Sequence, residues 1–84
     1  MEHHLSHNEL RNRQAQGPPI GSDWRHRKAG GWYRVVCTGI RESDCEPVVV
    51  YNGGGVYWVR PLAEFLERFE PRAAAGQAGA GGGV

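Results

Sequence analysis

Nearly all the aromatic and β-branched side chains of this 84-residue chain lie between Asp23 and Glu70. All three Trp, all three Tyr and both Phe residues fall inside that stretch. Such residues favour strands and fill hydrophobic cores. Because the flanking segments are poor in them, roughly 50 residues must supply the whole core, which is near the lower limit for a domain that folds alone. We therefore predict one small β-rich domain, which dense aromatic packing, a partner or a second copy would stabilise.

The two flanking segments have compositions that predict little packing. Residues 1–22 are polar and end in a Gly-Pro-Pro-Ile-Gly run, which neither continues a helix nor fits a strand. A short helix over residues 6–16 is compatible with Ser6 and Glu9 at capping-box spacing, but it has few apolar residues to bury. We expect residues 1–22 to form a mostly mobile arm, and residues 72–84, rich in Ala and Gly, to form a disordered tail.

The remaining segment, residues 23–71, contains four stretches with the composition of strands, each separated from the next by a polar or glycine-rich turn signal. The four stretches are residues 24–27, 32–40, 47–51 and 56–60. Alternation along the second stretch predicts one face with Tyr33, Val35 and Cys37, and a wetter face with Arg34, Val36 and Thr38.

A helix is predicted after the last strand. Pro61 suits the first position of a helix because its φ is preset and it has no amide hydrogen. Apolar residues then follow at i, i+3, i+4 and i+7, namely Leu62, Phe65, Leu66 and Phe69. This spacing predicts a helical face that covers the open side of the sheet, with Pro71 ending the helix. Because a flat sheet this small cannot enclose its apolar face, we predict a mainly β fold, a small SH3-like partial barrel of about four antiparallel strands with one short C-terminal helix.

The same residues carry a family resemblance. They run Trp24-Arg25-His26-Arg27-Lys28-Ala29-Gly30-Gly31-Trp32-Tyr33-Arg34-Val35, then Glu46-Pro47-Val48-Val49-Val50-Tyr51, then Trp58-Val59-Arg60-Pro61-Leu62 with Phe65. This pattern resembles the DUF1653 family of small bacterial domains of unknown function. The family has a longer segment before Trp-Val-Arg-Pro, and an aromatic residue where Arg27 stands. The resemblance implies the fold of residues 23–71 and no particular activity.

The Trp and Arg residues of this segment are interleaved, a composition used by single-strand nucleic-acid binders and by peptide-binding grooves. A net charge of only +1 argues against a strongly electrostatic partner. We predict a non-enzymatic interaction module that binds another protein through a Trp/Arg surface, with single-stranded nucleic acid as the alternative partner. The candidate binding residues are Trp24, Arg25, His26, Arg27, Arg34, Trp58 and Arg60.

Two of these candidates also have a structural interpretation, which we favour. The Arg60 guanidinium, at a strand end, could hold an anion of a ligand, but pairing with a carboxylate of the chain is favoured. The available carboxylates are Glu42, Glu46 and Glu64. His26 could donate to a phosphate, but a histidine within a strand is more often packed or hydrogen-bonded for structure.

An enzyme is the least favoured function. Nucleophilic catalysis would need a thiol or hydroxyl beside a base, and His26 with Cys37 is the pair that the sequence offers. No cofactor is expected. The arm contains three histidines, His3, His4 and His7, but no convincing fourth ligand, so no metal site is expected either.

Location and assembly are predicted from composition. No apolar run reaches the roughly 18 residues that span a bilayer, and the N-terminus lacks the pattern of a signal peptide, so we expect a cytoplasmic protein. Two cysteines are too few for a disulfide framework and should stay reduced there. We expect a monomer or a weakly self-associating protein.

Overall fold

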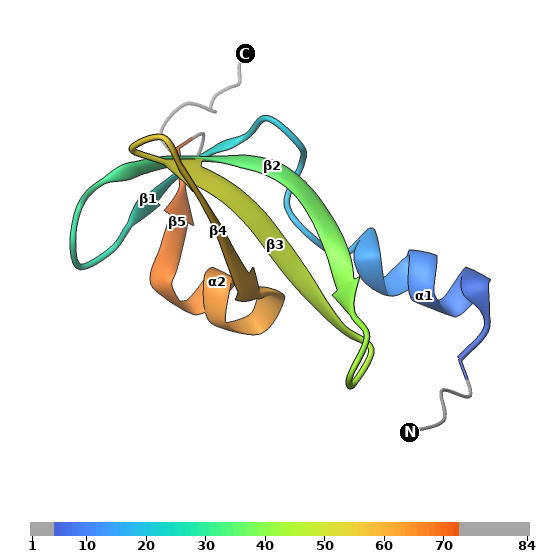
Figure 1. Cartoon of the computed structure of the whole chain (residues 1–84). Coiled ribbons are helices and arrows are strands. Elements are labelled where there is room, and N and C mark those ends of the chain that lie inside the picture. Colours follow the sequence, from blue (N-terminus) through green and yellow to red (C-terminus); the bar gives the residue numbers. More distant parts are fainter. Residues whose placement is uncertain (1–4, 73–84) are drawn as a thin grey trace, which may run out of the picture.

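The computed structural model describes residues 5–72 (Figure 1). Its elements in chain order are α1 His7–Gln14, β1 Asp23–His26, β2 Trp32–Arg41, β3 Glu46–Gly53, β4 Val56–Pro61, α2 Leu62–Arg68 and β5 Phe69–Pro71. All five strands pair antiparallel in one open sheet of order β4-β3-β2-β1-β5. The prediction of a mainly β fold with a short helix after the fourth strand is confirmed, and the arrangement is consistent with a small partial barrel.

The fifth strand takes the place of the end of the predicted helix. Helix α2 ends at Arg68, and Phe69–Pro71 forms β5, which pairs with β1. The prediction that Leu66 and Phe69 continue one covering helical face is therefore wrong. Leu66 is exposed, and Phe69 enters the core from a strand. Extended backbone here supplies hydrogen-bond partners to an otherwise open edge of β1, which outweighs the helical spacing of the side chains.

The turn between β3 and β4 has the form that its glycines predict. Gly54 and Gly55 have φ of 64° and 79°, so both central residues of this two-residue turn lie in the left-handed region. That is the turn type whose twist matches a hairpin, and glycine adopts it without a Cβ penalty. Pro61 ends β4 and occupies the N-cap position of α2. The helix therefore begins at Leu62, one residue later than predicted.

Strand β2 contains a bulge that the sequence does not reveal. Val35 lies opposite the core residue Tyr51, whereas Cys37 lies opposite Val50, so Val36 is the extra residue. Residues directly opposite each other share a face, and a one-residue shift moves all later side chains to the other face. The prediction that Cys37 shares a face with Val35 is therefore wrong, and Cys37 lies on the face away from the core.

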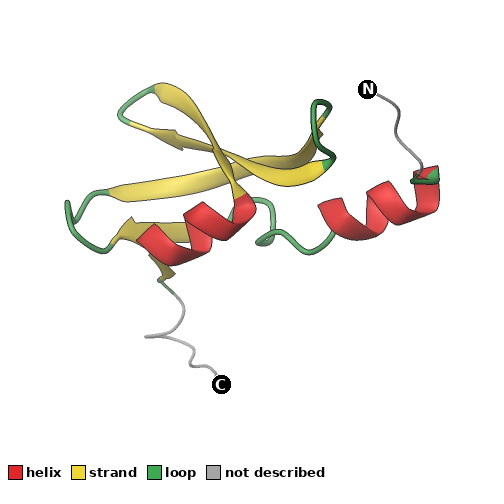
Figure 2. Cartoon of the chain, turned by 90° about the horizontal axis from the view of Figure 1, so that it is seen from below, coloured by secondary structure: helices red, strands yellow, loops and turns green. Residues whose placement is uncertain are grey.

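The core lies between the concave face of the sheet and α2, which runs next to β5 (Figures 1 and 2). Its buried residues are Trp24, Val35, Val49, Tyr51, Leu62, Phe65 and Phe69. Phe65 and Phe69 stack with ring centroids 4.5 Å apart, and Trp24 meets Phe65 edge-on at 5.1 Å. Aromatic rings thus form most of the core, as a domain this small requires.

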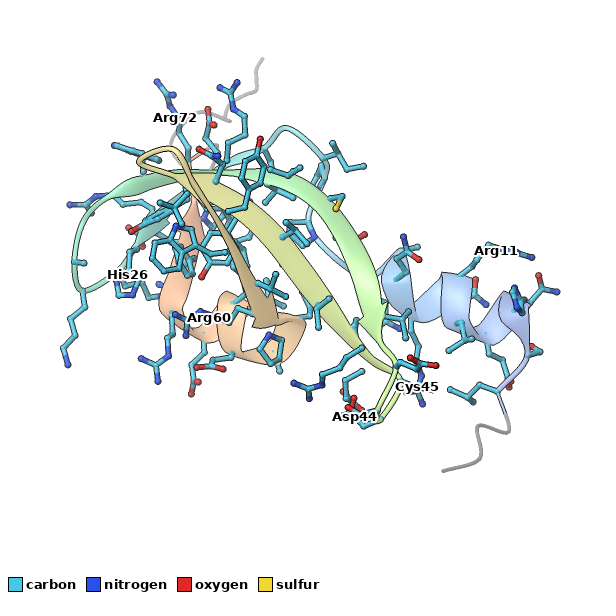
Figure 3. The ribbon with its side chains drawn as sticks, viewed as in Figure 1. Arg11, His26, Asp44, Cys45, Arg60 and Arg72 are labelled. Carbon is cyan, nitrogen blue, oxygen red and sulfur yellow. The ribbon has the colours of Figure 1, made fainter. Side chains whose placement is uncertain are left out.

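The N-terminal arm forms the predicted short helix and contacts the domain. Ser6 and Glu9 form a capping box at the start of α1. Near its end, Arg13 Nη1 donates to the carbonyl of Cys45 at 2.9 Å, in the turn between β2 and β3 (Figure 3 labels Cys45). The mobility of the arm stays a prediction. The first residue of the predicted disordered tail, Arg72, is ordered, since its backbone N–H donates to the carbonyl of Asp23 at 3.0 Å, and residues 73–84 lie outside the described residues.

Candidate binding site

A small pocket opens on the core face of the sheet, between β4 and the β1–β2 hairpin. It has a volume of about 170 Å³. Its lining residues are His26, Ala29, Tyr33, Tyr51, Trp58, Arg60 and Phe69, and we call it the aromatic pocket. Tyr33 meets Tyr51 at 5.6 Å and Phe69 at 5.3 Å between ring centroids, in both cases edge to face. These three packed rings give the pocket an apolar floor.

Trp58 forms an exposed rim of the aromatic pocket. It lies opposite Tyr51 in the β3–β4 ladder, which places it on the core face, yet it remains 45% exposed. Its Nε1–H donates to the carbonyl of Gly53 at 3.3 Å. That bond orients the ring while leaving a large apolar surface in contact with solvent, a feature typical of a binding site.

Arg60 is held on the second rim by three groups. Its Nε donates to the hydroxyl of Tyr51 at 3.1 Å, and its Nη1 donates to a carboxylate oxygen of Glu64 at 2.7 Å. The guanidinium also lies 6.0 Å from the ring centroid of Phe69. The hydrogen bond to Tyr51 and the nearby Glu64 raise the pKa of Arg60, so the group stays charged. The favoured interpretation, a guanidinium paired with a carboxylate of the chain, is confirmed with Glu64 as the partner.

His26 joins the hairpin to the pocket. Its Nδ1 accepts backbone N–H groups of Lys28 at 3.2 Å and Ala29 at 2.9 Å. In the neutral ring the hydrogen is therefore assigned to Nε2. The ring also packs edge-on against Phe69 at 5.0 Å. His26 has the structural contacts that the sequence favours, and it lies on the same side of the sheet as Arg60 (Figure 3).

A second, larger cavity adjoins the aromatic pocket through His26. It has a volume of about 440 Å³. Its lining residues are His26, Arg27, Lys28, Glu67 and Arg68, and we call it the basic cleft. Within residues 5–72, Arg27 pairs with Glu70 and Arg68 with Glu64, whereas Lys28 forms no ion pair. The cleft therefore offers Lys28 as a positive group for a ligand, beside Glu67, which also forms no ion pair within residues 5–72.

The family model described as "Protein of unknown function (DUF1653)" matches residues 22–75. The chain belongs to the DUF1653 family. The match includes every residue that lines the aromatic pocket and the basic cleft. No curated protein and no solved structure matches the chain.

Two of the predicted binding residues of this DUF1653 domain lie on the opposite face of the sheet. Arg34 pairs with Asp23 at 3.0 Å, and Arg25 pairs with Glu70 at 3.6 Å. Strand alternation places both arginines away from Tyr33 and the pocket. The predicted Trp/Arg surface is therefore divided between two faces, with only part of it at the pocket.

Trp24 is a core residue of the DUF1653 domain. It is 8% exposed, and its Nε1–H donates to the hydroxyl of Ser22 at 2.9 Å. A ring buried in this way offers no surface for stacking, so its prediction as a binding residue does not fit the structure. Of the seven predicted residues, those that line the two cavities are His26, Arg27, Trp58 and Arg60.

The floor of the pocket was not predicted from the sequence. Tyr33, Tyr51 and Phe69 lie at strand positions that favour core packing, and no sequence signal separates a core aromatic residue from one that also lines a pocket. For Tyr51 the sequence contains a partial indication of its role at the pocket. A buried tyrosine hydroxyl needs a partner, and an arginine in the following strand could supply one.

Two further predictions concern ligands and membranes. Among residues 5–72, no group of three potential metal ligands converges on one point. His3 and His4 lie outside the described residues. In the same part of the chain, neither helix is long and apolar enough to cross a membrane.

The Asp23–Arg34 pair predicts a measurable effect of acid on stability. The hydrogen bond from Arg34 lowers the pKa of Asp23 below its ordinary value of 3.8. The unfolded chain then binds more protons than the folded chain, so this stabilisation is present above the unfolded pKa and is lost as pH falls through the folded pKa. At about pH 6 we expect the unfolding temperature of the Asp23→Asn variant to be a few °C lower than that of the unchanged chain. Near pH ~2 the two unfolding temperatures should be equal.

Thermal unfolding followed by far-UV circular dichroism at each pH checks this expectation. Glu42→Gln is the matched control, because Glu42 is an exposed carboxylate that forms no ion pair within residues 5–72. A constant difference between Asp23→Asn and the unchanged chain at every pH would contradict the assigned role of Asp23.

Proposed function

We propose that this chain is a non-enzymatic protein-interaction module whose partner inserts one apolar side chain into the aromatic pocket beside Trp58. The half-exposed ring of Trp58 above an aromatic floor is the observation that carries the proposal. The pocket is smaller than the range of about 300–1,000 Å³ that is typical of small-molecule sites. A volume of about 170 Å³ suits a single side chain of a peptide.

The basic cleft refines the chemistry of the proposed partner. Because it adjoins the aromatic pocket through His26, an extended segment that fills the pocket continues past Lys28. Lys28 is the cation of this cleft that carries no carboxylate within residues 5–72. The segment that fits both features has an apolar or aromatic residue followed or preceded at short spacing by Asp or Glu.

The charge arrangement favours a protein over a nucleic acid. Arg27 and Arg25 pair with Glu70, Arg34 with Asp23, and Arg60 with Glu64. A nucleic-acid binder needs cations that are available to phosphates along one surface. Here the arginines are already paired with carboxylates and are divided between two faces, while the exposed apolar rim carries both signs of charge, as in a protein interface.

The structural contacts of His26 and the position of Cys37 support a module without catalytic activity. Its Nδ1 accepts backbone N–H groups, and Cys37 lies on the opposite face of the sheet. The pair that would have supplied a base and a nucleophile is therefore separated by the sheet. The proposed setting is the cytoplasm, in keeping with a chain that uses few cysteines.

Panning a phage-displayed random peptide library against the full chain tests this function. We expect enriched peptides that share one apolar or aromatic position near an acidic position. A synthetic peptide of the enriched sequence should bind with an affinity that Trp58→Ala lowers by at least about 10-fold, since exposed Trp residues are frequent hot spots. Isothermal titration calorimetry measures the affinity.

Trp32→Ala is the matched control, because Trp32 is 53% exposed but lies on the opposite face, under the guanidinium of Arg72. It should leave peptide affinity unchanged. Failure to enrich any shared pattern, or equal losses in both Trp variants, would reject the proposed site. Quenching of Trp fluorescence by single-stranded oligonucleotides at about 50 mM salt that fades at about 200 mM would instead favour the nucleic-acid alternative.

A further inference from the structure

Strand β4 is an edge strand whose first four residues, 56–59, lack the protection that edge strands usually carry. It pairs with β3 on one side, and within residues 5–72 no strand pairs with it on the other. Residues 56–59 are all exposed, and none of them is charged. Natural edges are commonly shortened or carry charges, prolines or bulges that prevent pairing. The opposite edge, β5, follows this rule, with three residues that include Glu70 and Pro71.

The hairpin geometry identifies which backbone groups of β4 face outward. The residues beside the two-residue turn, Gly53 and Val56, form a hydrogen-bonded pair. Because such pairs alternate, every second residue after Val56 also bonds to β3, and the intervening residues, Tyr57 and Val59, direct their N–H and C=O groups outward. Pro61 falls at the next outward position, where its lack of an N–H breaks no bond to β3.

We propose that a second copy of this chain covers this edge, through antiparallel pairing of β4 with β4 about a two-fold axis at Trp58. In this register Tyr57 of each copy lies opposite Val59 of the other, and each such pair exchanges two backbone hydrogen bonds. The outward groups are symmetric about Trp58, which is what a two-fold contact requires. The two five-stranded sheets then form one continuous sheet with both aromatic pockets on the same side.

The side chains of β4 suit this contact. Tyr57 and Val59 are each 66% exposed on the face away from the core, and the proposed register places them across from each other as an aromatic and β-branched pair. On the core face, Trp58 lies across from its own copy at a closely spaced pair. The Tyr57–Val59 pairs cover apolar surface that the single chain leaves in water.

Charge does not oppose the contact. Arg60 is the only charged residue of β4. In the proposed register it lies opposite Val56 of the other copy, so the two Arg60 residues are four positions apart, roughly 13 Å along the strands. That separation exceeds the screening length of about 8 Å at physiological salt, and each guanidinium keeps its own partner, Glu64. A foreign strand has no such built-in match of symmetry and charge.

Sedimentation velocity of the full chain over about 10 μM to 1 mM, combined with amide hydrogen exchange by NMR, tests the pairing. We expect the mass to rise from 9.3 kDa towards twice that value. The Tyr57 and Val59 amides should gain protection over the same range, while the Trp58 amide, already bonded to β3, should not change. A constant mass of 9.3 kDa, or dimers without protection of Tyr57 and Val59, would overturn the proposal.

Two variants give an independent test. Val59→Lys places a charge in the contact and should weaken association at least about 10-fold, as charged residues do at natural edges. Leu66→Lys is the matched control, since it adds the same charge at an exposed apolar residue of α2, and it should associate like the unchanged chain. Circular dichroism verifies that both variants fold. Equal association of the two variants would reject β4 as the contact.

Cysteine cross-linking reports the register. Trp58→Cys places two thiols at the two-fold axis, close enough for a disulfide under oxidising conditions. Val56→Cys places them four positions apart, beyond disulfide reach. In a Cys37→Ser background we expect a covalent dimer with Trp58→Cys and none with Val56→Cys. The reverse pattern would reject the two-fold axis at Trp58.

Discussion

Replacing Phe69 with alanine is expected to leave much of the chain unfolded at 37 °C. Phe69 is 1% exposed and stacks on Phe65 at 4.5 Å, while Tyr51 and Tyr33 meet it edge-on at 5.2 and 5.3 Å. Its removal opens a cavity where helix α2 and three strands meet, and Phe→Ala changes in cores cost about 3–5 kcal/mol. A domain with so small a core has a total stability of similar size.

Chemical denaturation followed by far-UV circular dichroism measures this loss. Leu66→Ala is the matched control, because Leu66 lies three residues earlier and is 46% exposed. It should change the free energy of unfolding by less than about 1 kcal/mol. Similar midpoints for Phe69→Ala and the unchanged chain would show that Phe69 does not hold α2 against the sheet.

The sequence predicts most of the sheet because local signals and tertiary pairing agree there. Strand β3 follows from its valine run, and its hairpin with β4 follows from the glycines of the turn. The failures come where pairing overrides local pattern. No residue type in the sequence marks the bulge at Val36. Phe69 fits the helical spacing of α2, but residues 69–71 form a strand because they pair with β1. Neither choice is visible without knowing which strands are neighbours.

The sequence predicted some residues of the candidate site, but not the face of the sheet on which each one lies. His26, Trp58 and Arg60 are conspicuous as charged or aromatic residues in apolar strands, and the structure brings them together at one pocket. Trp24 has the same local character but turns towards Phe65 in the core. The face of the sheet on which a strand residue lies depends on the strand register. Composition can therefore identify candidate surface residues, but it cannot assign them to a face. The partner of Arg60 was predictable because Glu64 lies in the first turn of the adjoining helix, four residues after Arg60.

Replacing Gly53 with alanine is expected to destabilise the fold by about 1–3 kcal/mol and to disturb the floor of the aromatic pocket. The Tyr33 ring lies directly over Gly53, and a Cβ there would overlap that ring. Tyr33 cannot move without losing its edge-to-face contacts with Tyr51 and Phe69. We therefore expect both a lower unfolding midpoint and weaker binding of any peptide that fills the pocket.

Gly39→Ala separates this packing effect from the general effect of changing a strand glycine. A Cβ at Gly39 would meet a methyl group of Val48 at 3.6 Å, an ordinary contact. Alanine there reduces the freedom of the unfolded chain and should be neutral or stabilising by up to about 1 kcal/mol. If Gly53→Ala were equally neutral, Tyr33 would be able to leave Gly53 at little cost. The aromatic floor would then be adaptable, and the partner side chain would not have to match a fixed shape.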